Sequence, residues 1–285
     1  MRLRDSLATI TARPSRRPPP VVVVGMHRSG TSAVSRLLHD AGVNMGYRQD
    51  GNGESLFFLR INHWLLRQCG ATWANVDQIP ELLAEHADAL EPVVERRIRS
   101  LASIEHFGLR PETGPWGIKD PRISMLYPLY DRLFPECRFV VVSRHGVDVA
   151  QSLRSRAIAS AAFVGGDAVT PLFGVRQPRS NRMQNAVVAS DLDRNLRLWS
   201  RYQESLEGLE PTVGGQRVLR LRFEDLVRNP AHDLKRLSDF VGVTVVDTGL
   251  NADRAFVFES SPDLAAFART RARELSAFGY QATRD

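Results

Sequence analysis

The chain has 285 residues, 43% of them hydrophobic and 25% charged, which is the composition of a globular protein with a sizeable core. No run of 18 apolar residues occurs, so a transmembrane helix is not expected. The formal net charge is +6, and arginine supplies the excess, which favours an anionic partner. Charge alone does not separate a phosphate or sulfate ligand from nucleic acid or an anionic membrane surface.

In chain order, the basic, proline-rich residues 1–20 come first, and they lack the apolar segment of a signal peptide. We expect a disordered leader there and a single domain over residues 21–285. Two isolated cysteines, Cys69 and Cys137, have no metal-ligand spacing and are typical of buried thiols in a reducing compartment. The sequence therefore predicts a cytoplasmic protein without a bound metal, and it leaves the oligomeric state open.

Strands alternate with helices along the rest of the chain. The predicted strands lie at 21–24, 116–118, 138–143 and 218–221, and the predicted helices at 29–40, 55–69, within 80–107, and at 124–134, 147–156, 191–209, 230–240 and 262–278. Residues 157–187 are predicted to form a mobile loop or lid. This order predicts an α/β fold of the P-loop type, with three α/β/α layers around a central parallel sheet.

The segment 21–32, VVVVGMHRSGTS, joins a buried strand, a glycine-rich turn and the start of a helix. Free backbone N–H groups and the helix dipole favour an anion at such a helix start. Gly25 and Gly30 permit the tight backbone path. Hydroxyl donors come from Ser29, Thr31 and Ser32. The segment therefore predicts a phosphate-binding loop.

This loop differs from the loop of nucleoside triphosphatases, G-x-x-x-x-G-K-[ST], because Thr31 stands where their lysine would be. The cation lies three positions earlier, at Arg28. A cation before Ser-Gly-Thr resembles the 5′-phosphosulfate loop of sulfotransferases that use 3′-phosphoadenosine-5′-phosphosulfate (PAPS). The resemblance implies that the 5′-phosphosulfate is bound by Arg28, Ser29, Gly30, Thr31 and Ser32.

A second motif, VVVSRHGVDVAQSLRSR at 140–156, places Arg144 where a strand turns into a helix, and Ser152 eight residues later. In open parallel sheets, ligands bind at this edge. The pair resembles the 3′-phosphate motif of sulfotransferases, in which an Arg and a Ser hold that phosphate. Two phosphates on one adenosine need no β,γ-phosphate lysine and no Mg²⁺.

A third motif, WGIKDPR at 116–122, resembles the K-D-P element of tyrosylprotein-type and many bacterial sulfotransferases. The resemblance implies that Lys119 reaches the sulfuryl group and, with Arg28, neutralises charge in the transition state. Asp120 would then hold the geometry of these cations. Pro121 is expected to begin the next helix.

Glu54 precedes Asn62 by eight residues, which matches the glutamate base of bacterial relatives, although Asn52 and Gly53 replace two aromatic residues of their pattern. The resemblance implies that Glu54 accepts the proton of the acceptor hydroxyl. His27 and His63 are the alternative bases.

Phe223, in LRFEDL at 221–226, resembles an aromatic residue that lies against the adenine, and core packing is an equal alternative. Trp199 is expected in the core. The resemblance covers residues 20–242, so no role is predicted for the last forty residues. It implies a PAPS-dependent enzyme that sulfates a hydroxyl of a small molecule, lipid or glycan without stable membrane insertion. Basic residues near the lid, Arg154, Arg156, Arg176, Arg179 and Arg182, indicate either an anionic acceptor or a solvated face.

Two other functions remain open from the sequence. A P-loop kinase of a small molecule would share the loop, but Thr31 argues against it. A nucleic-acid-binding module would share the basic charge, but no aromatic platform accompanies it. We therefore expect nucleic acid not to be a partner.

Overall fold

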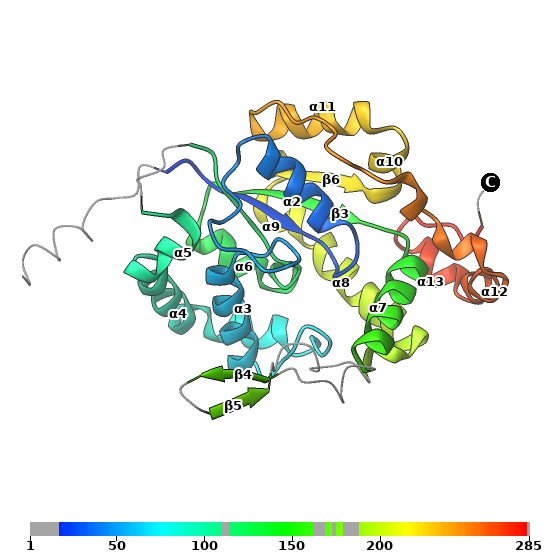
Figure 1. Ribbon diagram of the computed structural model, residues 1–285, viewed down its shortest axis with the longest axis horizontal. Coiled ribbons are helices and arrows are strands. Elements are labelled where there is room, and N and C mark those ends of the chain that lie inside the picture. The colour runs from blue at the N-terminus through cyan, green and yellow to red at the C-terminus, as the bar shows by residue number, and fades with distance from the viewer. Residues whose placement is uncertain (1–16, 110–113, 162–168, 173–174, 179–187, 284–285) are drawn as a thin grey trace, which may run out of the picture.

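A computed structural model describes residues 17–109, 114–161, 169–172, 175–178 and 188–283 (Figure 1). Its centre is a four-stranded parallel sheet formed by β1 (Val21–Val24), β2 (Gly117–Lys119), β3 (Arg138–Ser143) and β6 (Val218–Arg222). The strand order is β2-β1-β3-β6, and Val21 of β1 pairs with both Gly117 and Arg138. β-Branched runs such as VVVV form strands that are buried on both faces, as the sequence predicted.

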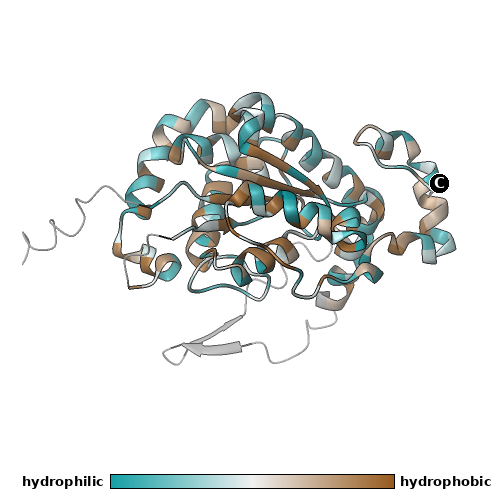
Figure 2. Ribbon diagram, turned by 90° about the horizontal axis from the view of Figure 1, so that it is seen from above, coloured by the Kyte–Doolittle hydropathy of each residue, from teal (hydrophilic) through white to brown (hydrophobic). Residues whose placement is uncertain are grey.

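Two layers of helices cover the two faces of the sheet (Figure 1). One face packs against α2 (Thr31–Asp40), α10 (Phe223–Arg228) and α11 (Pro230–Val241). The other packs against α3 (Leu56–Gln68), α4 (Ile79–Ile98), α6 (Ile123–Leu133), α7 (Gly146–Ala161) and α8 (Leu192–Glu207). Figure 2 shows the hydrophobic strands between helices of mixed hydropathy, which is the pattern of amphipathic helices on a buried sheet. The predicted three-layer α/β fold is confirmed.

Most predicted boundaries lie within a few residues of the observed ones. The region 80–107 contains the long helix α4 and a second short one, α5 (Ile104–Phe107), after the turn η1 (Leu101–Ser103). The predicted C-terminal helix is divided into α12 (Pro262–Thr270) and α13 (Ala272–Ser276). Before them come the short elements α9 (Leu209–Val213), η3 (Gly215–Arg217), η4 (Ala252–Arg254) and η5 (Val257–Ser260).

Two expectations need correction. The helix predicted to end at 156 continues as α7 to Ala161, because no Gly or Pro interrupts residues 157–161. The predicted loop at 157–187 contains an antiparallel pair, β4 (Val169–Leu172) and β5 (Val175–Pro178), and η2 (Val188–Ser190) follows it. Much of the remaining loop lies outside the described residues, so its role as a lid stays a prediction.

The chain enters the domain through residues 17–20, at the end of the predicted leader. The carbonyl oxygen of Pro18 accepts a hydrogen bond from Trp116 Nε1 at 2.7 Å, and that of Pro20 accepts one from the N–H of Arg138 at 3.0 Å. Residues 1–16 lie outside the described residues, and the disordered leader stays a prediction. Within the described part of the chain, no helix is both long and apolar enough to span a bilayer. Both cysteines are buried free thiols.

Candidate active site

The predicted phosphate loop connects β1 to α2 at the carboxyl edge of the sheet. Gly30 is the N-cap of α2 with φ 102°, and no side chain among the described residues caps the helix. The first backbone N–H groups of α2 are therefore available to an anion. Arg28 has φ 73°, a left-handed backbone angle that is uncommon for a residue with a side chain.

Glycine is required twice in this loop. A Cβ on Gly25 would lie 2.2 Å from the carbonyl oxygen of Val142, and one on Gly30 would lie 2.3 Å from Cδ2 of Phe223. The loop is thus packed between β3 and the start of α10. Phe223 is buried, and the guanidinium carbon of Arg144 lies 5.1 Å from the centre of its ring. Phe223 contacts the phosphate loop and lies beneath Arg144, so it sits beside both predicted phosphate motifs.

The two predicted phosphate motifs meet at Arg28. Its Nε donates a hydrogen bond to Ser152 Oγ at 2.9 Å, and its carbonyl oxygen accepts one from Arg144 Nη1 at 3.2 Å. Trp199 is buried as expected, and its Nε1 donates to the carbonyl oxygen of Arg144 at 3.0 Å. The core tryptophan therefore also fixes the turn that carries Arg144.

Four arginines converge at this edge of the sheet. Arg28 is exposed at the surface, yet burial of part of its side chain and the positive charges of Arg156, Arg144 and Arg254 lower its pKa. Such mutual repulsion is relieved when an anion binds between the guanidinium groups. Arg254 belongs to η4, for which the sequence predicted no role.

The predicted catalytic residues meet where β2 ends. Lys119 Nζ donates hydrogen bonds to Ser32 Oγ, to the carbonyl oxygen of Asn52 and to Glu54 Oε1, each at 3.1 Å. Lys119 and Glu54 are both buried. Residues from three distant segments of the sequence therefore form one cluster directly beside the first turn of α2.

Arg122 completes this cluster, although the sequence gave it no assigned role beyond its place in the third motif. Its Nη1 donates to Glu54 Oε2 at 3.1 Å and to Asp120 Oδ1 at 2.9 Å. Asp120 Oδ2 accepts from Asn62 Nδ2 at 2.8 Å, and Asn62 Oδ1 accepts from the hydroxyl of Tyr130 at 2.6 Å. This buried chain of hydrogen bonds holds Arg122 against Glu54, and the cation that Asp120 contacts directly is Arg122.

The electrostatics of the cluster keep the proton affinity of Glu54 above that of an exposed glutamate. Burial raises the pKa of Glu54, and the neighbouring carboxylate of Asp120 raises it further, while Lys119 and Arg122 act in the opposite direction. For Arg122, burial lowers the pKa, but the carboxylates of Asp120 and Glu54 outweigh it and raise the pKa of the guanidinium. Arg122 therefore stays charged beside the carboxylate.

The two alternative bases are less suited to hold a proton. His27 packs its ring against Trp73, with centroids 4.9 Å apart. Burial and then the charges of Arg122 and Lys119 lower its pKa well below the usual value. Burial and Arg122 also lower the pKa of the half-buried His63. Pro121 does not begin the next helix as expected, because α6 starts at Ile123 after a turn in which Pro121 accepts from the N–H of Ser124 at 3.1 Å.

The side chains around these motifs fit a ligand with two separate anionic groups. Buried polar atoms without a hydrogen-bond partner include Ser29 Oγ in the loop, Arg144 Nε in the second motif and Arg122 Nε in the catalytic cluster. Buried donors of this kind are costly unless a ligand or water satisfies them. Within the described residues no group of three His, Cys, Asp or Glu side chains is placed to hold a metal ion. Arg154 and Arg156 lie on α7, whereas the side chains of Arg176, Arg179 and Arg182 lie outside the described residues.

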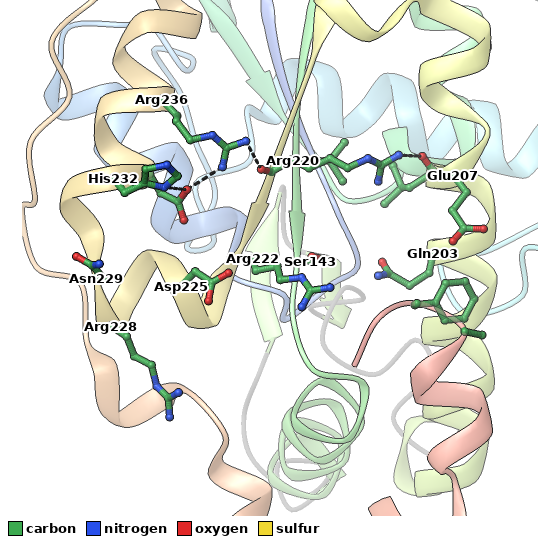
Figure 3. Close-up of a pocket in the computed structure, with 15 residues that line it drawn as sticks. Ser143, Gln203, Glu207, Arg220, Arg222, Asp225, Arg228, Asn229, His232 and Arg236 are labelled. Atoms are coloured by element: carbon green, nitrogen blue, oxygen red, sulfur yellow. Dashed lines mark hydrogen bonds and ion pairs between the residues drawn. The ribbon is translucent and has the colours of Figure 1, made fainter. Parts of the chain in front are cut away.

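A groove of about 610 Å³ lies elsewhere, along the edge strand β6 between α8 and α11 (Figure 3). None of the predicted site residues lines it, and its arginines are already engaged. Arg220 pairs with Glu210 at 2.6 Å and Arg236 with Asp233 at 2.8 Å. The convergence of chemical groups, and not this groove, therefore locates the candidate active site.

The structure thus combines a parallel α/β sheet, the predicted phosphate loop and a buried cluster of Lys119, Glu54 and Arg122 beside that loop. The family model described as the Sulfotransferase family matches residues 19–247, and the chain belongs to that family. Membership of this family supports the classification of the protein as a transferase. The sequence resemblance is thereby confirmed at the level of the family.

Solved structures of sulfotransferases are similar to this chain. The sulfotransferase domain of the olefin synthase of Synechococcus PCC 7002 superposes with a TM-score of 0.50 at 19% identity, over 95% of this chain and 98% of that one. A sulfotransferase from Alicyclobacillus acidocaldarius superposes with a TM-score of 0.48 at 15% identity, over 93% and 97% of the two chains. At 19% identity the Synechococcus domain shows a shared fold. No match was found among curated proteins.

Proposed function

We propose that this protein transfers a sulfuryl group from PAPS to a hydroxyl of a small molecule, lipid or glycan. The observation that carries the proposal is the meeting of two phosphate motifs at Arg28, which contacts Ser152 at 2.9 Å and Arg144 at 3.2 Å. Two anion-binding sites that share Arg28 would suit a nucleotide with a phosphate at its 3′ position and a phosphosulfate at its 5′ position.

The donor would be held from both sides of the arginine cluster. The loop and the start of α2 would bind the 5′-phosphosulfate, and Arg144 with Ser152 would bind the 3′-phosphate. Arg254, for which the sequence predicted no role, would supply an additional cation, because its charge lowers the pKa of Arg28. Phe223, which lies against Arg144 and Gly30, would contact the adenosine.

When bound, PAPS supplies an activated sulfuryl group, whose S–O bond to the 5′-phosphate breaks as the acceptor oxygen forms a new bond to sulfur. Lys119, 3.1 Å from Ser32 Oγ, is placed to neutralise charge on the transferring group, together with Arg28. Positioned charges of this kind are the main requirement of phosphoryl and sulfuryl transfer. No residue here needs to form a covalent intermediate.

Glu54 would take the proton of the acceptor hydroxyl. A carboxylate offers about four lone-pair positions. Lys119 and Arg122 use one on each oxygen, which leaves positions free for the hydroxyl. The buried chain from Tyr130 through Asn62 and Asp120 would keep Arg122, and through it Glu54, in place during the reaction.

The alternatives predict different ligands. A P-loop kinase would need Mg²⁺ and ATP, and a nucleic-acid-binding module would need an extended basic surface with exposed aromatic residues. A cytoplasmic location and a metal-free reaction go with the proposed function. We propose these features together with the donor.

Transfer of labelled sulfate from PAPS to a panel of glycans, lipids and phenols tests the proposal. Lys119→Ala should lower kcat by about 10²- to 10³-fold, the cost of removing one charge-stabilising group from an active site. Lys235 provides the matched control, because it is the other lysine of the chain and pairs with Asp239 on the surface of α11. Lys235→Ala should retain full activity.

Calorimetry with adenosine 3′,5′-bisphosphate tests the donor seat independently of the acceptor. We expect binding without Mg²⁺, weakened about 10- to 100-fold by Arg144→Ala, the loss of hydrogen bonds to a charged group. Absence of binding, or binding that is indifferent to Arg144→Ala, would contradict the proposal. Mg²⁺-dependent turnover of ATP would favour the kinase.

A further inference from the structure

Residues 251–260, which contain η4 and η5, pack against the start of α7, more than a hundred residues earlier in the sequence. Phe258 is buried, and its ring stacks on that of His145 with centroids 4.1 Å apart. The backbone of Phe256 is left-handed, with φ 55°, which is strained for an aromatic residue. Local contacts that over-determine the backbone are needed to hold this 251–260 segment in place.

One carboxylate supplies such contacts. Asp148, on the first turn of α7, is buried and faces the 251–260 segment. Its Oδ1 accepts a hydrogen bond from the N–H of Phe258 at 2.8 Å, and its Oδ2 accepts one from the N–H of Val257 at 3.2 Å. A buried carboxylate that accepts backbone N–H groups makes strong, charge-assisted hydrogen bonds.

The same carboxylate also contacts the second phosphate motif. Asp148 Oδ2 pairs with Arg144 Nη2 at 3.2 Å. Arg144 Nη2 in turn donates to the carbonyl oxygen of Arg254 at 2.5 Å. Asp148, Arg144 and the 251–260 segment therefore form a closed set of contacts, and the charge of Arg254 in this segment lowers the pKa of Arg28.

We propose that Asp148 is a positioning residue for the donor nucleotide: it orients Arg144 and fixes the 251–260 segment so that the Arg254 guanidinium completes the 3′-phosphate seat. The proposal rests on the proposed function, because it assigns Asp148 to the same donor site. Asp148 itself is covered by Arg144 and the segment and does not contact the nucleotide. Asp148 would affect nucleotide affinity indirectly, by positioning Arg144 and Arg254, which are 110 residues apart in the sequence.

A double-mutant cycle tests this coupling. The variants are Asp148→Asn, Arg254→Ala and their combination, and the measurement is the affinity for adenosine 3′,5′-bisphosphate by calorimetry. Arg254→Ala removes the guanidinium but keeps the carbonyl oxygen that Arg144 contacts. Asp148→Asn keeps the shape of the side chain, but an NH2 group in the position of Oδ2 cannot accept from Val257 and Arg144.

We expect each single substitution to weaken binding by about 10-fold or more, as for the loss of hydrogen bonds to charged groups. The double variant should lose clearly less than the product of the two single losses, because Asp148 acts partly through Arg254. In the sulfation assay, Asp148→Asn should raise KM for PAPS by a larger factor than it lowers kcat.

Hydrogen exchange provides a second readout that needs no nucleotide. The amides of Val257 and Phe258 should lose protection in Asp148→Asn. Asp233→Asn is the matched control, because Asp233 is another buried carboxylate but pairs with Arg236 on α11. This control should change neither the protection of the 251–260 segment nor the affinity for the bisphosphate.

The outcomes separate the two proposals. The role of Asp148 would be overturned if the loss of affinity in the double variant equalled the product of the two single losses. It would also be overturned if the amides of Val257 and Phe258 kept their protection in Asp148→Asn. If the wild-type protein fails to bind the bisphosphate, the proposed function is overturned, and with it the role of Asp148 in donor binding. The hydrogen-exchange experiment would still decide whether Asp148 fixes the 251–260 segment.

Discussion

The contact between Gly30 and Phe223 gives a prediction with a calculable size. An alanine at position 30 would adopt φ 102°, and its Cβ would lie 2.3 Å from Cδ2 and 3.0 Å from two other atoms of the buried ring. The left-handed backbone costs a side-chain-bearing residue roughly 1–2 kcal/mol, and overpacking a buried contact costs about 1–3 kcal/mol more. We expect Gly30→Ala to lower the free energy of unfolding by about 2–5 kcal/mol, the sum of these two costs.

Gly42 separates the two contributions. It follows Ala41, the C-cap of α2, with φ 89°, and a Cβ there would meet no atom within 4 Å. Gly42→Ala should therefore cost only the backbone strain, roughly 1–2 kcal/mol, in equilibrium urea unfolding of the same protein. The difference between the two variants measures the steric contact with the ring.

A second substitution tests the origin of the difference. Phe223→Leu removes ring atoms from the contact, so Gly30→Ala should cost less in a Phe223→Leu background than in the wild type, and the free energies should not add. The reasoning is refuted if Gly30→Ala is no more destabilising than Gly42→Ala. It is equally refuted if the effects of Gly30→Ala and Phe223→Leu are additive.

Three further outcomes are expected. Burial raises the pKa of Glu224 from 4.5 to about 7, so wild-type stability should fall by about 3 kcal/mol as pH rises through that range, and Glu224→Gln should remove this dependence in unfolding measured between pH 5 and 8. Arg122→Gln removes a charge that lowers the pKa of Glu54, so the acid limb of the pH–rate profile should move to higher pH, whereas the exposed Arg132→Gln should leave it unchanged. Asn62→Leu leaves Asp120 Oδ2 and the Tyr130 hydroxyl without their buried hydrogen-bonding partner, so the free energy of unfolding in urea should fall by about 2–5 kcal/mol. A decrease below about 1 kcal/mol would contradict the buried network.

The fold was predictable because its strands are buried β-branched runs followed by clear helix starts. The runs at 21–24 and 138–143 became β1 and β3 with the predicted bounds, since few other structures bury VVVV and FVVV on both sides. The pair β4 and β5 was missed, because VTPL and VRQP are only four residues long, each contains a proline, and neither shows the alternation or apolar run that predicts a strand.

Within the candidate site, local motifs predicted most of the residues that the structure brings together. Lys119 and Glu54, predicted from separate motifs, lie 3.1 Å apart. Arg254 could not be found in this way, because it is one arginine among many in a short 3-10 turn. Its place depends on contacts between Arg144, Asp148 and backbone atoms far along the chain, which have no local signature. The chemical roles of all these residues remain predictions.

The order of the strands also constrains how the protein is made. Among the strands that the structure describes, β1 pairs with β2 and β3 alone, so Val21 has no strand partner until Gly117 and Arg138 have been synthesised. Translation at about 5–20 residues per second leaves this apolar strand unpaired for several seconds, a period in which binding by a chaperone would protect it from association. Gly25 packs against Val142 of β3, so the phosphate loop cannot assume its form before that strand is present. A nucleotide could therefore stabilise the nascent domain only after the sequence through Val142 has left the ribosome.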